Sequence, residues 1–387
     1  MSGPVYLDHN ATTPVAPAVA DAMAEALHCL YGNPSSAYAP GREAARRVGV
    51  ARQQVADLVG ASPKELIFTG CATEANNLAL LGVAATRATP GHLVISAVEH
   101  PAVAEPARHL ESQGWRLTVV SVDSRGQISA DDVVAAVAED TVLVSIMLAN
   151  NEVGTLQPVR EIAGRLQGRG VLMHTDAAQA VGKIPVQVDE LGVDFLTLAG
   201  HKFRASKGVG ALYVRTGAPV QRILHGAGHE QGLRPGTENV PAIIGLGVAA
   251  ELAGEHLASS PNRLQERRDT LHRMLATGVA DLALNGHPDQ RLPNTLNVSF
   301  PGVTGQALLE TVGDTVFASV GSACHSGTSA PSGVLGAMGL DTARASGAVR
   351  LSVGWDTAEN ELQCAAEALV RAWQTQQRSE KGSASIY

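Results

Sequence analysis

Lys202 is the residue whose position says most about possible chemistry. The largely apolar residues 193–199 lead through Gly200 and His201 directly into it. A lysine amine at the mouth of a buried sheet is poorly hydrated, so either its pKa falls or the amine is used covalently. Such an amine can form a Schiff base with a carbonyl cofactor such as pyridoxal phosphate. The simpler alternative is a lysine on the loop after a core strand.

Two further groups follow predicted strands. Ala72 and Thr73 open a predicted helix after a strand over Leu66–Thr69. The free backbone N–H groups of a helix start can bind a phosphate, although this could also be a plain helix start. Asp176 follows another predicted strand, with Gln179 three residues later. A carboxylate at a buried strand end needs a cation, which a protonated pyridine nitrogen would supply.

His100 and Asn151 follow two more predicted strands. A histidine at the mouth of a site could stack on a flat ring and move protons, although a single histidine is often structural. In an open parallel sheet, ligands bind beyond the carboxyl ends of the strands, where all these residues fall. The series of phosphate-binding turn, stacking histidine, ring-nitrogen carboxylate and lysine therefore favours a pyridoxal phosphate site.

The second half of the chain adds a thiol and a guanidinium. Cys324 lies in residues 319–327, which are rich in glycine and serine, and a thiol there suits nucleophilic or carrier chemistry. Cys364, on a predicted amphipathic helix, is instead expected in the core. Arg350 lies in an apolar predicted strand and needs an anion there, either a substrate carboxylate or an internal Asp or Glu.

The elements that must position these residues alternate between strand and helix over residues 62–215, which predicts an α/β fold with a mostly parallel sheet flanked by helices. Strands are expected at residues 66–69, 93–97, 115–122, 141–148, 171–175, 195–199 and 210–214. After residue 260 the strand–helix pattern changes, with predicted strands at 294–300 and 348–353 and a last predicted helix at 358–377. We therefore expect a large domain over residues 15–260 and a smaller α+β domain built from residues 1–14 and 261–387.

Composition excludes several classes of protein. The chain has 387 residues, enough for two domains, and a net charge of −8 without a long basic run, which argues against direct nucleic-acid binding. No apolar stretch approaches the length of a membrane span, and the N-terminal residues lack the features of a signal peptide. The four cysteines form neither a disulfide framework nor a CxxC pair, so no metal site is expected and a cytoplasmic location is predicted.

Nearly from end to end, the chain resembles the cysteine desulfurases of the NifS/IscS type. These are homodimeric, pyridoxal-phosphate-dependent enzymes of fold type I, the fold of aspartate aminotransferase. The resemblance rests on an ordered set of motifs: Tyr6-Leu7-Asp8-His9-Asn10-Ala11-Thr12-Thr13-Pro14, Gly32-Asn33-Pro34-Ser35-Ser36, Ala72-Thr73-Glu74, Glu99-His100, Asn150-Asn151-Glu152-Val153-Gly154, Asp176-Ala177-Ala178-Gln179, Gly200-His201-Lys202, Arg234-Pro235-Gly236-Thr237-Glu238-Asn239, Pro293-Asn294-Thr295-Leu296-Asn297-Val298, Gly321-Ser322-Ala323-Cys324 and Arg350-Leu351-Ser352.

The resemblance implies a role for each candidate residue. Lys202 would hold the cofactor and later move protons. The other cofactor contacts would be Ala72, Thr73 and His201 to the phosphate, Thr237 to the phosphate from the partner subunit, Asp176 to the ring nitrogen, Gln179 to the ring hydroxyl, His100 stacked on the ring, and Asn151 beside cofactor and substrate. Arg350 and Asn33 would bind the substrate L-cysteine. Cys324 would take its sulfur as a persulfide, release L-alanine and pass the sulfur to an acceptor protein.

Three positions depart from the pattern of that family. Ala199 stands where Ser or Thr is usual, which implies the loss of one hydroxyl to the phosphate. Tyr38 stands where His is usual, and Arg204-Ala205-Ser206-Lys207-Gly208 replaces a segment close to Tyr-Gly-Pro-Lys-Gly.

Three alternative functions are compatible with parts of the sequence. A selenocysteine lyase shares the fold and cofactor, an aminotransferase of the same group would have no use for Cys324, and a non-catalytic sulfur carrier would have no use for Lys202 or Asp176. The destination of the sulfur is left open among iron–sulfur cluster biosynthesis, tRNA thiolation, cofactor synthesis and DNA phosphorothioation.

Overall fold

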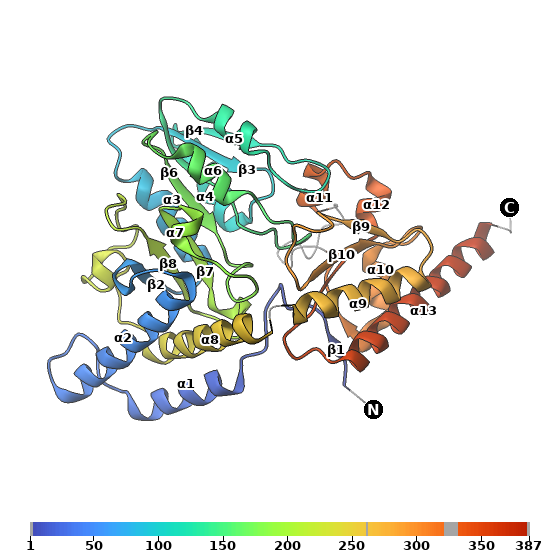
Figure 1. Cartoon of the computed structure of the whole chain (residues 1–387), viewed down its shortest axis with the longest axis horizontal. Helices are drawn as coiled ribbons and strands as arrows, with labels where there is room; N and C mark the ends of the chain where they lie inside the picture. The colour runs from blue at the N-terminus through green and yellow to red at the C-terminus, as the bar shows by residue number, and fades with distance from the viewer. Residues whose placement is uncertain (1–2, 261, 321–331, 385–387) are drawn as a thin grey trace.

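Two lobes, each built around its own sheet, make up the molecule (Figure 1). The structure is a computed structural model and describes residues 3–260, 262–320 and 332–384. The larger lobe holds a seven-stranded sheet, and the smaller lobe holds a three-stranded and a two-stranded sheet.

The sheet of the larger lobe has the strand order β2-β8-β7-β6-β5-β3-β4. Its strands are β2 (Leu66–Thr69), β3 (His92–Ser96), β4 (Arg116–Val120), β5 (Thr141–Ser145), β6 (Leu172–Asp176), β7 (Phe195–Ala199) and β8 (Gly210–Val214). Strand β8 is antiparallel to both of its neighbours, β2 and β7. These two strands are therefore parallel to each other. The carboxyl ends of the other strands therefore meet at one edge, as the alternation of strands and helices predicts.

Helices cover both faces of this sheet (Figure 1). Those of the larger lobe are α1 (Pro17–Cys29), α2 (Ala39–Val59), α3 (Ala72–Ala84), α4 (Pro101–Ser112), α5 (Ala130–Ala136), α6 (Val159–Leu166), α7 (Val188–Leu191) and α8 (Val240–Ser259). Apolar residues of α3 and α4 pack with Ile67 of β2, whereas those of α2, α6 and α8 pack with Leu66 and Phe68. Successive residues of one strand thus enter opposite cores, because side chains alternate across a sheet.

Contrary to the expectation that no apolar stretch approaches the length of a membrane span, helix α8 is long and apolar enough, by length and composition alone, to cross a membrane. Its packing accounts for that composition: Ile243, Leu246 and Ala250 are buried against the core that α1 and α2 share. Gly247 lets α8 lie close to α2, since a Cβ atom there would stand 2.6 Å from the Cα atom of Ala51.

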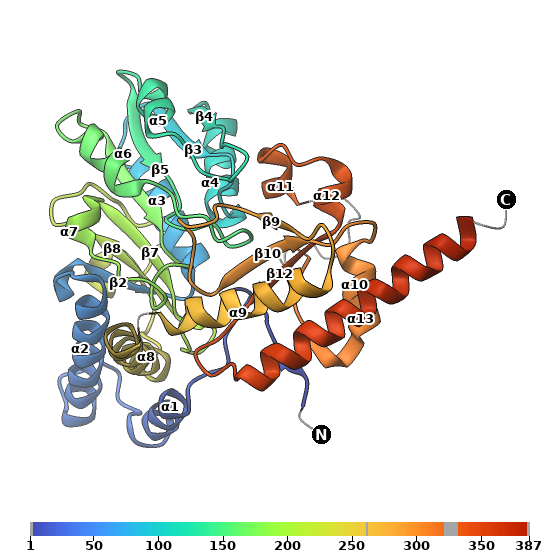
Figure 2. The same cartoon turned by 45° about the vertical axis from the view of Figure 1, so that its right-hand side comes forward.

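The smaller lobe combines three antiparallel strands with long helices (Figure 2). Its elements are β1 (Val5–Tyr6), α9 (Arg263–Gly278), β9 (Ala283–Asn285), β10 (Thr295–Ser299), α10 (Gly305–Val312), β11 (Val316–Phe317), α11 (Gly333–Ala337), α12 (Thr342–Ser346), β12 (Ala348–Ser352) and α13 (Glu359–Ala384). Leu271 of α9 and Leu369 of α13 are buried with Leu351 of β12 in one core. Cys364, expected inside this core, is instead half-buried at its margin.

The N-terminal segment joins the two lobes. It begins in the smaller lobe, where β1 pairs with β11, and then crosses to the larger lobe. There the backbone N–H of Thr13 donates to the carbonyl oxygen of His201 (2.9 Å), and that of Ala16 donates to the carbonyl of Arg204 (3.0 Å). The residues between β1 and α1 consequently run beside Lys202.

The predicted α/β fold class is confirmed, and the strands at 66–69, 195–199 and 210–214 have the predicted bounds. The strand predicted to reach residue 148 ends at Ser145. Its hydrogen bonds nevertheless continue, since the N–H groups of Ile146 and Leu148 donate to carbonyls of β6. The last helix extends to Ala384, beyond the predicted end at residue 377.

Candidate active site

The carboxyl edge of the large sheet holds a cavity of about 270 Å³. Side chains from the strand ends, from the N-terminal segment and from β12 of the smaller lobe all line it. The residues around it are Ala72, Thr73, His100, Asn151, Asp176, Gln179, His201, Lys202 and Arg350, together with Asn10, Ala11, Cys71 and Ala199. The fold therefore brings most of the predicted site residues to one place.

Lys202 ends a single turn of 3-10 helix, η2 (Gly200–Lys202), directly after β7. Its Nζ atom donates hydrogen bonds to the backbone carbonyl oxygens of Asn10 (2.7 Å) and Ala11 (2.8 Å). The amine is thus held at the boundary between the cavity and the N-terminal segment. From this position it can bond covalently to a carbonyl ligand in the cavity.

Asp176 is the last residue of β6 and is buried. Its carboxylate accepts hydrogen bonds from Nδ2 of Asn76 (2.7 Å) and from the backbone N–H of Ala178 (2.9 Å). Within the described parts of the chain, no cationic side chain forms an ion pair with it. A buried, hydrogen-bonded carboxylate without a cation suits a protonated ring nitrogen.

The turn before α3 is built to receive an anion. Cys71 is the residue that precedes the helix, and its side chain does not cap it, so the N–H groups around Thr73 are left for a ligand. Glu74 fixes this turn by accepting hydrogen bonds from the N–H of Gly70 (2.7 Å) and from Nε of Arg234 (2.8 Å).

Two histidines line the cavity, each with one ring nitrogen already engaged. His100 precedes α4, and its Nδ1 accepts a hydrogen bond from the N–H of Ala102 (3.1 Å), so Nδ1 carries no proton. The Nδ1 atom of His201 lies 3.2 Å from Oγ1 of Thr12. Burial, followed by the charge of Lys202, lowers the pKa of His201 to about 4. Its ring is therefore neutral at pH 7.

Arg350, on β12, is only 2% exposed and forms the internal ion pair that the sequence left open as an alternative. Its Nη2 atom lies 2.6 Å from Oδ1 of Asp8, and its Nη1 donates to the carbonyl oxygen of Asn151 (3.1 Å). The same guanidinium lines the cavity, and its buried Nε atom has no hydrogen-bond partner among the residues that the structure describes. Asp8 and Asn151 thus hold the fork in a fixed orientation from which it can also meet a carboxylate.

Two predicted site residues that the structure describes do not line the cavity of their own chain, and a third lies outside the described residues. Thr237 precedes α8 and Asn33 lies between α1 and α2, and both are exposed and absent from the lining. Cys324 lies outside the described residues. The assignments of all three stay predictions.

The three departures from the family pattern have different surroundings. Ala199 lines the cavity with a methyl group, and Tyr38 is 55% exposed. Arg204 forms an ion pair with Asp356 and lies over the ring of Trp355, with 5.6 Å between the guanidinium carbon and the ring centroid. The segment after Lys202 is therefore tied to the smaller lobe.

Sequence reasoning gave no role to Asn10, Asn76 or Lys183. All three are buried and hydrogen-bonded to predicted site residues. Asn10 stands in a quoted motif, but its partners are far away along the chain and leave no local signal. Lys183 could have been noticed only as a lysine in an otherwise apolar stretch.

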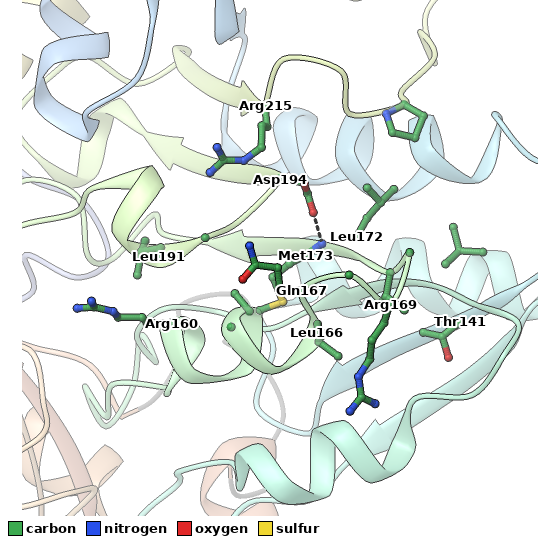
Figure 3. Close-up of a pocket in the computed structure, with 18 of the residues that line it drawn as sticks. Thr141, Arg160, Leu166, Gln167, Arg169, Leu172, Met173, Leu191, Asp194 and Arg215 are labelled. Carbon is green, nitrogen blue, oxygen red and sulfur yellow. Dashed lines mark hydrogen bonds between the residues drawn. The ribbon is translucent and has the colours of Figure 1, made fainter.

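A larger cavity of about 910 Å³ lies at the opposite edge of the same sheet (Figure 3). It is lined by the start of β6, by Asp194 just before β7 and by α6, with Arg160, Arg169 and Arg215 around it. Asp194 at this edge accepts a hydrogen bond from the N–H of Met173 (2.8 Å). None of the predicted site residues that the structure describes lines this cavity, and ligands of parallel sheets bind at the other edge.

Comparison with known proteins identifies the family of the chain. The family model for aminotransferase class-V matches residues 5–364. A cysteine desulfurase of Nostoc sp. is 44% identical over 359 residues, which cover 92% of this chain and 90% of that protein. A solved NifS-like protein superposes with a TM-score of 0.89 at 38% identity, covering 96% of this chain and 99% of its own. A structure described as SspA in complex with cysteine gives 0.81 at 36% identity, covering 90% and 98%.

The chain therefore belongs to the aminotransferase class-V family. It is a pyridoxal-phosphate-dependent enzyme of the cysteine desulfurase group. The site fits that cofactor: the start of α3 suits its phosphate, Asp176 suits its ring nitrogen, and the Lys202 amine suits its aldehyde.

Proposed function

We propose that the chain removes the sulfur atom from L-cysteine, leaving L-alanine and a persulfide on Cys324. The observation that carries this proposal is the meeting of Lys202, Asp176 and Arg350 around one cavity. An amine, a carboxylate without a cation and a guanidinium match the aldehyde and ring nitrogen of the cofactor and the carboxylate of an amino acid.

Pyridoxal phosphate, when bound, supplies an electron sink for the substrate's α-carbon. Lys202 moves protons at that carbon, and its two carbonyl partners orient the amine. Arg350 holds the substrate carboxylate. His100, whose Nδ1 is fixed by the backbone N–H of Ala102, would stack its imidazole on the cofactor ring without rotating. The thiolate of Cys324 then forms a bond to the substrate sulfur as the carbon–sulfur bond breaks, and a proton completes the alanine methyl group.

The test of this function is the pair of variants Cys324→Ala and Cys29→Ala. In the presence of a thiol reductant, we expect the first to lose at least about a hundredfold in sulfide release and the second, whose thiol is exposed on α1, to keep wild-type activity. Full sulfide release by Cys324→Ala would contradict the persulfide mechanism. Turnover of selenocysteine without turnover of cysteine would instead favour a selenocysteine lyase.

We propose further that the active form is a homodimer. Thr237 and Asn33 lie away from the cavity of their own chain, so a second copy would have to bring them to a site. Large apolar side chains are exposed on and between α1 and α2, namely Leu27, Tyr31, Tyr38 and Val50, as expected of a surface that another copy covers. Sedimentation equilibrium of the purified chain tests this, and a monomer at micromolar concentration would contradict it.

The destination of the sulfur is also a proposal. We propose a protein acceptor in the cytoplasm, with iron–sulfur cluster biosynthesis as the first pathway to examine, since nothing in the net charge of −8 favours nucleic acid. Cell fractionation tests the location. Capture of partners by the wild type, but not by Cys324→Ala, through a disulfide to the persulfide cysteine would identify the acceptor.

A further inference from the structure

Lys183 is a buried lysine to which the proposed mechanism gives no task. It follows β6 and is 5% exposed. Its Nζ atom donates to Oδ1 of Asn10 (2.9 Å) and to Oε1 of Gln179 (2.7 Å). No Asp or Glu in the described ranges forms an ion pair with it. A buried amine without an anionic partner destabilises the fold, so its presence calls for another reason.

The surroundings of Lys183 are rich in positive charge. Burial, followed by the charges of Lys202 and Arg350, lowers the pKa of Lys183 well below its usual range. Lys183 in turn contributes to the lowered pKa values of His9 and His201. Whether charged or neutral, the amine has N–H groups to donate to both amide oxygens.

The first consequence concerns the orientation of Gln179, which lines the cavity. Because Lys183 donates, the amide must turn its oxygen toward Lys183 and its NH₂ group the other way. One hydrogen of that NH₂ group goes to the carbonyl oxygen of Asn10 (2.9 Å). The amide oxygen is therefore engaged by Lys183, and the second hydrogen of the NH₂ group is the one that can be donated to a ligand in the cavity that Gln179 lines.

The second consequence concerns Asn10. The amine of Lys202 donates a hydrogen bond to the backbone carbonyl oxygen of this residue (2.7 Å). The side-chain oxygen of Asn10 accepts from Lys183 and from Asn294 (3.0 Å), so its NH₂ group faces Thr295 (2.8 Å). Lys183 thus holds, from the larger lobe, the same residue that Asn294 and Thr295 hold from the smaller lobe.

We propose that Lys183 is a positioning residue of the cofactor site, which acts on the cofactor by fixing the orientation of the Gln179 amide. The inference rests on the proposed role of Gln179 at the ring. It predicts that loss of Lys183 weakens cofactor binding through Gln179, and not through a general loss of stability.

The experiment measures the dissociation constant of pyridoxal phosphate for the full chain, stripped of cofactor and titrated by visible absorbance. We expect Lys183→Met to weaken binding about tenfold, the effect of one lost hydrogen bond to a ligand. Gln157→Met is the matched control. Gln157 is equally buried in the larger lobe and also makes two hydrogen bonds, to the N–H of Ile128 (2.8 Å) and the carbonyl of Gly126 (2.7 Å), away from the cavity. This control should lower the melting temperature and leave the dissociation constant within about twofold.

A double-mutant cycle with Gln179→Leu separates the possibilities. If Lys183 acts through Gln179, Lys183→Met adds less than about twofold in the Gln179→Leu background. An unchanged dissociation constant for Lys183→Met alone, or effects of the two variants that simply multiply, would overturn the inference. An unchanged constant for Gln179→Leu would instead refute the proposed role of Gln179.

Two further variants keep the test decisive if Lys183→Met does not fold. Lys183→Gln keeps one amide donor and should weaken binding about threefold, again only when Gln179 is present. Gln179→Glu gives Lys183 a carboxylate partner and should fold, yet it offers no donor edge and should bind the cofactor as weakly as Gln179→Leu. Wild-type binding by Gln179→Glu would contradict the proposal.

Discussion

At the scale of single residues, Glu99, which directly precedes the cavity-lining His100, carries a carboxyl group that is protonated near neutral pH. Oε1 of Glu99 accepts hydrogen bonds from Oγ of Ser96 (2.6 Å) and the N–H of Met147 (2.9 Å), while its buried Oε2 has no partner in the described ranges of the chain. Burial, with a smaller contribution from Asp176, raises the pKa of Glu99 to about 8. The folded chain therefore holds a proton that the unfolded chain releases above about pH 4.5.

Because of this difference in pKa, Glu99 lowers the stability of the folded chain increasingly as pH rises. Between about pH 4.5 and pH 8 the unfolded state loses its proton first, so stability falls as pH rises. Glu99→Gln mimics the protonated acid and should gain up to about 4 kcal/mol over wild type by pH 8.5, with no gain at pH 4.5. Thermal melting at several pH values checks this. The exposed control Glu111→Gln should follow wild type, and an equal gain at all pH values would exclude a protonated Glu99.

Arg350 is the residue at which a structural and a substrate role can be separated. If Arg350 served only to pair with Asp8, Arg350→Lys would lower stability and leave the kinetic constants unchanged. Because a lysine cannot reproduce the fork, we expect at least a tenfold rise in KM for L-cysteine, with cofactor binding within about twofold of wild type. Steady-state kinetics and a cofactor titration measure the two quantities. An unchanged KM would mean that Arg350 serves only in the internal ion pair with Asp8 and does not bind the substrate.

At the scale of elements, the turn before α3, which we propose binds the cofactor phosphate, depends on the strand beside it. Gly210 begins β8, and a Cβ atom there would stand 2.8 Å from the carbonyl oxygen of Leu198 and 2.9 Å from the carbonyl carbon of Cys71. Gly210→Ala must therefore shift the backbone of the turn, and we expect cofactor binding to weaken at least tenfold. Gly164→Ala, on α6 with nothing within 4 Å of the added atom, should bind normally. Equal binding by both variants would show that the turn tolerates the shift.

At the scale of the whole molecule, the proposed dimer would complete each site with Thr237 of the partner subunit. Lys202→Ala and Thr237→Asp should each be inactive alone, the second because its carboxylate would repel the phosphate. After the two are unfolded and refolded together, a mixed dimer has one site with both native residues. We expect about a quarter of wild-type activity, since half of the dimers are mixed and each keeps one site. Activity no higher than that of the separate variants would mean that Thr237 serves its own chain.

Much of the fold and part of the site follow from the sequence alone. Continuous apolar runs such as residues 195–199 mark buried strands, and Lys202 and Asp176 stand at strand ends because a parallel sheet gathers its ligand groups there. This determined the α/β class, the edge of the sheet that carries the site and the kind of cofactor it suits. The ordered motifs determined the family.

Only the tertiary structure decided which groups hold these residues in place. Asn10 meets Lys183 and Asn294, and Arg350 meets Asp8, across separations of well over a hundred residues that no local pattern encodes. The antiparallel direction of β8 likewise depends on its pairing with β2 and β7. Hydrophobic periodicity reports how each segment is buried, whereas the partner of a buried polar atom is set by how the two lobes meet.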